Sequence, residues 1–108
     1  MSLEIARNRI FLYQGTCDMR RSFDKLACVV IEHMHENPLS GDLFVFLNKK
    51  RTMLKVLYWD KDGYAIWYKR LEKGRFMRPK TDGLEMNRSH WMHLLEGVEV
   101  KIIKKQPR

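Results

Sequence analysis

The chain has 108 residues, a length that suits one domain over residues 1–108 and excludes two independently stable hydrophobic cores. Its formal net charge is +8, and the excess is uneven: residues 1–54 hold eight basic and six acidic side chains, residues 55–108 thirteen and seven. No apolar run approaches the roughly 18 residues of a membrane span, so we expect a cytoplasmic protein without membrane contact, whose partner is nucleic acid or an acidic protein surface.

The first elements predicted are a short strand over residues 10–14, ended by Gly15, and a long helix capped by Asp18 or Ser22. Asn37 and Pro38 are expected to stop this helix. One apolar face follows from the three-and-four spacing of Phe23, Leu26, Ala27, Val30, Ile31 and Met34. Cys17 and Cys28 lie too far apart for a CxxC pair, so both are predicted to be free thiols, with Cys28 packed in the helix interface.

The unbroken apolar run 43–47 predicts a central strand that is buried on both faces. Residues 53–59 and 64–71 then predict a hairpin around Asp60-Lys61-Asp62-Gly63, whose Asp-Gly step would supply the positive φ angles of the turn. An even-length turn sorts the strands into two faces, Lys55-Leu57-Trp59-Tyr64-Ile66-Tyr68-Arg70 and Leu54-Val56-Tyr58-Ala65-Trp67-Lys69-Leu71, and a bulged loop would change that sorting. The second face is the more aliphatic, so we expect it to lie against the long helix.

After a predicted loop over residues 73–82, Asn87 or Ser89 opens a short helix with Trp91, Leu94 and Leu95 as its apolar stripe. Gly97 is expected to end this helix, and the alternation over 98–103 predicts a final strand. Residues 104–108 read as a flexible, solvated tail. The whole pattern predicts an α+β fold, with a mainly antiparallel sheet of about five strands, one long helix and one short C-terminal helix.

Two segments resemble a known family: TCDMRRSFDKLACVV (16–30) and SGDLFVFLNKKRTMLKVLYWDKDGYAIWYKRLEKGRFMRP (40–79). They are similar in order and spacing to the TnpB accessory protein of the sixty-six family of bacterial insertion sequences. The resemblance implies a small non-catalytic protein that assists transposition beside a separate, larger transposase of the same element. Seven basic residues match family motifs: Lys49, Lys50, Arg51, Lys69, Arg70, Lys73 and Arg75. Met77 and Arg78 depart from the pattern, which implies something more apolar before Pro79.

Two surfaces are candidates for binding. The basic residues just named, with Arg78 and Lys80, could form one patch that contacts DNA phosphates, or could serve only to keep a sheet edge soluble. The aromatic face of the hairpin, with Lys55, Trp59, Tyr64 and Tyr68, could instead bind the transposase or another protein of the element, without direct DNA contact. Both functions stay open at this point.

Catalysis is not expected. Asp60 and Asp62 suit turn chemistry better than a metal site, and His90 with His93 would need a third ligand. His33 and His35 point in different directions on a helix, and Cys17, Ser22 and Ser40 lack a recognisable base. We therefore expect no cofactor, no metal and no enzymatic activity.

Overall fold

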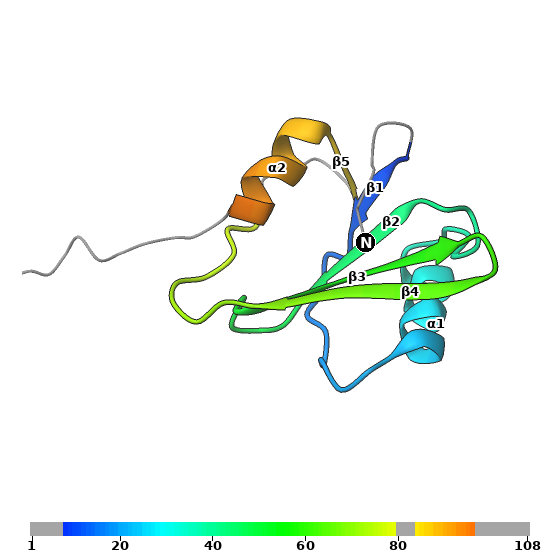
Figure 1. Cartoon of the computed structure of the whole chain (residues 1–108), viewed down its shortest axis with the longest axis horizontal. Helices are drawn as coiled ribbons and strands as arrows, with labels where there is room; N and C mark the ends of the chain where they lie inside the picture. The colour runs from blue at the N-terminus through cyan, green and yellow to red at the C-terminus, as the bar shows by residue number, and fades with distance from the viewer. Residues whose placement is uncertain (1–7, 80–83, 97–108) are drawn as a thin grey trace, which may run out of the picture.

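The computed structural model describes residues 8–79 and 84–96. Within them, five strands form one sheet in the order β4-β3-β2-β1-β5: β1 (Ile10–Leu12), β2 (Leu43–Leu47), β3 (Met53–Asp60), β4 (Gly63–Arg70) and β5 (Glu85–Met86) (Figure 1). All neighbouring pairs are antiparallel except β1 and β2. With helices α1 (Phe23–His33) and α2 (Arg88–Glu96), this confirms the α+β prediction. The strand predicted over 98–103, Gly97, Lys80 and the tail 104–108 lie outside the described residues.

Helix α1 begins after Ser22, one of the two predicted caps, but the Ser22 side chain makes no capping hydrogen bond. The helix ends at His33, before the predicted stop at Asn37. His35 adopts a left-handed φ of 55°, and the Glu36 amide donates to the Val30 carbonyl oxygen at 3.1 Å across this turn. That arrangement closes the helix C-terminus without the proline.

The buried face of α1 consists of Leu26, Ala27, Val29 and Val30, with Met34 just beyond the helix. Phe23 and Ile31, which were predicted on this face, are 43% and 54% exposed, so that part of the prediction is wrong. The helix is rotated so that Val29 meets the sheet in their place. The prediction for Cys28 is also wrong, because its side chain is exposed while that of Cys17 is buried.

The β3–β4 hairpin has a two-residue turn, with Asp60 paired to Gly63 and Trp59 to Tyr64. The even turn confirms the predicted sorting of side chains into two faces. Its left-handed residue is Lys61, with φ 56°, and not the Asp-Gly step that was expected to supply the positive φ.

Two apolar clusters cover the two faces of the sheet, and each contains one helix. On one face, α1 packs with Phe44, Phe46 and Leu57, and with the partly buried Tyr64 and Ile66. On the other, Trp91 and Leu94 of α2 pack with alternate residues of β1, β2 and β3 and with Phe76. The long helix therefore lies on the Leu57 face of the hairpin, and the prediction that it would lie on the more aliphatic face is wrong. α2 takes that face instead.

The predicted central strand is confirmed, because all five residues of β2 are buried. Asn87 is confirmed as the residue that opens α2: its side-chain oxygen accepts the His90 amide at 2.7 Å, and its carbonyl oxygen accepts the Trp91 amide at 3.0 Å. Leu95 is partly buried against the Trp91 cluster. No helix in the described ranges is long and apolar enough to cross a membrane.

Candidate nucleic-acid interface

The loop between β2 and β3 is held in shape by Asn48. Its side-chain oxygen accepts the backbone amides of Thr52 and Met53, each at 2.9 Å, and its carbonyl oxygen accepts the amide of Arg51 at 3.0 Å. Arg51 adopts a left-handed φ of 59° in this turn. The loop therefore presents Lys49 and Lys50, both exposed, from a defined backbone. Asn48 was not singled out from the sequence, where an asparagine after a strand signals only a turn.

The chain that leaves β4 returns to this loop. The Leu71 amide donates to the Thr52 carbonyl oxygen at 2.8 Å, and the Phe76 amide donates to the Arg51 carbonyl oxygen at 2.7 Å. The Phe76 side chain is fully buried in the cluster that contains Trp91. These contacts fix residues 71–76 beside the β2–β3 loop, at the end of the hairpin remote from its turn (Figure 1).

Six exposed cations consequently lie at one end of the sheet, and we call this set the basic end: Lys49, Lys50, Lys69, Arg70, Lys73 and Arg75. Side chains of Lys69 and Arg70 lie on opposite faces of β4, so the charges surround that end. Arg70 also donates to Glu72 at 3.1 Å in an ion pair whose side chains are 65% and 77% exposed. A pair this exposed contributes little to stability and leaves Arg70 accessible to another anion.

Arg78 differs from the basic end, because its guanidinium faces inward. It donates to the carbonyl oxygens of Tyr13 and Gly15, both at 3.3 Å. Partial burial, with the nearby Arg51 charge, lowers its pKa from the ordinary value. In this position Arg78 joins the segment after β4 to the end of β1. Arg51 is partly buried beside it and less accessible than Lys49 and Lys50.

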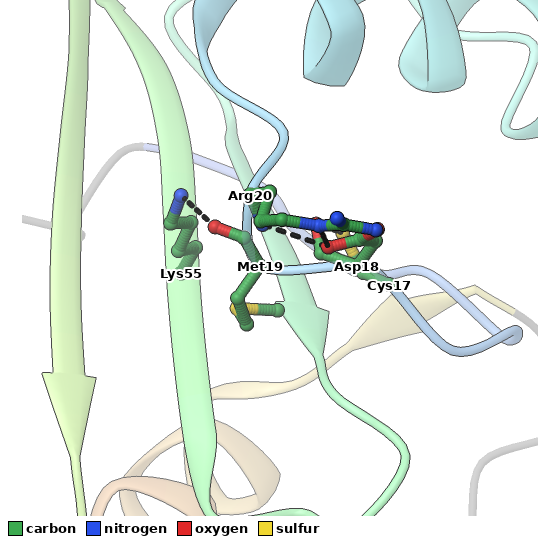
Figure 2. A network of polar contacts seen from close by, with 5 residues as sticks. All are labelled: Cys17, Asp18, Met19, Arg20 and Lys55. Carbon is green, nitrogen blue, oxygen red and sulfur yellow. Dashed lines mark hydrogen bonds and ion pairs between the residues drawn. The ribbon is translucent and has the colours of Figure 1, made fainter.

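Lys55 is not part of an exposed surface, contrary to the sequence prediction. It is 7% exposed, and its ammonium donates to the carbonyl oxygens of Met19 and Arg21, both at 2.8 Å. The ammonium also lies 4.7 Å from the centre of the Tyr68 ring. Figure 2 shows Lys55 reaching from its strand to Met19 in the segment before α1, where Arg20 and Asp18 form an ion pair of 2.7 Å. Lys55 therefore anchors the entry to α1.

The predicted aromatic surface is divided along the hairpin. Trp59 and Tyr64, beside the turn, are partly buried and meet edge to face with ring centres 5.2 Å apart. Tyr64 also belongs to the α1 side of the core. Tyr68, at the other end, is 50% exposed, and it lines an open hollow of about 380 Å³ with Met53, Arg70 and Glu72. Tyr68 thus lies next to the basic end and away from the other two rings.

Within residues 8–79 and 84–96, no three or more His, Cys, Asp or Glu side chains lie close enough together to hold a metal ion. Asp60 and Asp62 are exposed at the hairpin turn, as the turn prediction implies.

Fold and surface together define the class: a small basic α+β protein with six of the twelve exposed Lys and Arg side chains of its described residues at one end of a sheet. Within that class, the chain belongs to the family of IS66 Orf2-like proteins, whose family model matches residues 8–105. This membership confirms the resemblance inferred from the sequence and makes the chain an accessory protein associated with transposition.

Two relatives come from Sinorhizobium fredii. The uncharacterized protein y4hO is 37% identical over 93 residues, covering 84% of this chain and 81% of the relative. The uncharacterized protein y4jC is 32% identical over 101 residues, covering 92% of this chain and 86% of the relative. No solved structure matches the chain significantly.

Proposed function

We propose that this protein assists transposition by contacting DNA through the basic end, without catalysing a chemical step itself. The observation that carries the proposal is the union of two sequence segments, 49–50 and 69–75, by the backbone hydrogen bonds of Leu71 and Phe76. Surface charges that served only solubility would have no need of a fixed common position. The protein would bind the DNA of the element in the cytoplasm, together with the transposase.

The physical basis of the contact is the release of counterions from the phosphate backbone. If four of the six cations neutralise phosphates, the logarithm of the binding constant falls with the logarithm of salt concentration with a slope of about −3.6. Affinity then drops roughly 150-fold between about 50 and 200 mM salt. The exposed ring of Tyr68 beside Arg70 adds a surface for a base or a sugar, and such a surface suits both single-stranded and double-stranded DNA.

Fluorescence anisotropy with labelled DNA from the element ends tests the proposal at these two salt concentrations. The double variant Lys73→Glu, Arg75→Glu should lose binding at the lower salt, because two phosphate contacts become repulsions. The matched control Lys25→Glu, Lys61→Glu makes the same change in net charge at exposed positions on α1 and at the hairpin turn, away from the basic end. It should retain most of the affinity. Equal losses in both variants would mean that only net charge matters, and an absence of salt-sensitive binding would remove the DNA contact.

A protein-interaction module is the second candidate, favoured by the half-exposed Tyr68 and by the hollow beside it. In this version the protein binds the transposase of the element and does not touch DNA. Tyr68→Ala should then abolish co-purification with the transposase at high salt, while Lys73→Glu, Arg75→Glu should leave it intact. The reverse result would reject this candidate.

A further inference from the structure

Strand β4 forms an edge of the sheet built by the described residues. Its neighbour in the described sheet is β3 on one side, and no described strand lies on the other. It is eight residues long, and its first six residues, Gly63 to Tyr68, contain no charge and no proline. Tyr, Ile and Trp favour extended structure, so this edge offers a row of backbone donors and acceptors in a segment suited to pairing with another strand.

The opposite edge differs in a way that makes β4 stand out. β5 has two residues, and the exposed Arg9–Glu85 ion pair of 2.7 Å lies across its contact with β1. Short and charged edges are the usual protection against unwanted pairing. β4 has neither feature along its first six residues. The clusters that contain α1 and α2 lie on the two faces of the sheet.

We infer that β4 pairs antiparallel with β4 of a second copy of this chain, so that the two sheets join into one continuous sheet in a two-fold symmetric dimer. A two-fold axis perpendicular to the sheet keeps the two faces unchanged, so each residue must meet one from its own face. Ile66 then lies opposite Ile66 of the other copy and Tyr64 opposite Tyr68. Arg70, at the end of β4, comes beside the turn residue Asp62 that directly precedes β4 of the other copy.

Charge complementarity favours a second copy of this chain as the partner, paired in this register. Asp62 and Arg70 are both exposed and carry opposite charges, and symmetry produces the pair twice. Shifting the centre to Trp67 would place Arg70 opposite Tyr64 and lose both ion pairs. Parallel pairing would set Lys69 and Arg70 of the two copies side by side, which like-charge repulsion disfavours. The antiparallel dimer also separates the two basic ends to opposite extremes of the shared sheet.

Sedimentation equilibrium of the full chain, over about 5 to 200 µM, tests the inference. The expected mass rises from 13.0 kDa towards twice that value. Asp62→Arg and Arg70→Asp should each weaken the dimer about tenfold or more, because each places like charges opposite one another twice. The double variant Asp62→Arg, Arg70→Asp should restore it. A monomer throughout this range, or a dimer insensitive to the charge reversals, would overturn the inference.

Hydrogen exchange supplies a measurement that needs no variant. Amides of β4 that point away from β3 should exchange more slowly as protein concentration rises through the dimerisation range, whereas those of α2 should not respond. A dimer that forms without a concentration-dependent change in β4 would use another surface, and the β4 pairing would be refuted.

Discussion

Replacing Lys55 by methionine tests whether a buried ammonium holds the entry to α1. Lys55 is 7% exposed, and its two hydrogen bonds of 2.8 Å go to the carbonyl oxygens of Met19 and Arg21, more than 30 residues earlier in the chain. Methionine keeps the length of the apolar stem but cannot donate, so the substitution isolates the polar contacts from the packing.

The change in the free energy of unfolding is the sum of two losses and one gain. Hydrogen bonds from a charged donor contribute about 1.5–3 kcal/mol each, and a buried carbonyl oxygen left without a donor costs about 1–3 kcal/mol. Removing the ammonium relieves its desolvation, which offsets several kcal/mol of this loss, and water can reach part of the site. We expect Lys55→Met to lower the free energy of unfolding by about 2–4 kcal/mol, with the π contact to Tyr68 contributing about 0.5–1 kcal/mol of that.

Urea unfolding followed by circular dichroism measures the change as a shift of the midpoint at constant slope. The exposed Lys61→Met is the matched control and should stay within about 0.5 kcal/mol of the parent. Hydrogen exchange in the segment 17–22 should also be faster in Lys55→Met than in the parent protein, and this acceleration should be larger than that in β2. If Lys55→Met were as stable as the control, the anchoring role would be wrong.

Three further predictions concern single groups. At neutral pH a thiol reagent should modify Cys28 rapidly and Cys17 only on unfolding, because Cys28 is exposed whereas burial shields the Cys17 thiol and raises its pKa. Cys28→Ser should remove the fast phase of modification, and two rapidly modified thiols in the parent protein would contradict the prediction. Asn87→Ala should destabilise the protein by about 1 kcal/mol in thermal unfolding through loss of the His90 amide contact, while Asn87→Asp should change it little; equal effects would show that the cap is unimportant. Hydrogen bonds from Arg20 hold the pKa of the Asp18 carboxyl well below its usual range. The pair therefore stabilises the fold above about pH 4, and this contribution is lost as the pH falls through the lowered pKa. In Arg20→Ala, carboxyl NMR titration should show the Asp18 pKa returning towards its usual value, and an unchanged pKa would refute the assignment.

Local features of the chain were readable from the sequence because each depends on neighbours a few residues away. The spacing of Leu26, Ala27 and Val30 indicated α1, the continuous run 43–47 indicated a strand buried on both sides, and the two strands around Lys61 and Asp62 indicated a hairpin. The structure decided that its turn is even in length. The basic end was partly predictable for the same reason, since its members lie in two short segments at the ends of consecutive strands.

Contacts between distant segments were decided by the tertiary structure. Both faces of the hairpin carry enough apolar side chains to take a helix, so periodicity could not show that α1 would choose the Leu57 face and α2 the other. Lys55 becomes buried because the Met19 and Arg21 carbonyl oxygens arrive beside it, and Arg78 turns inward because Tyr13 and Gly15 do the same. A residue's own type states what it can donate or bury, but the partner that satisfies it is supplied only when the chain folds.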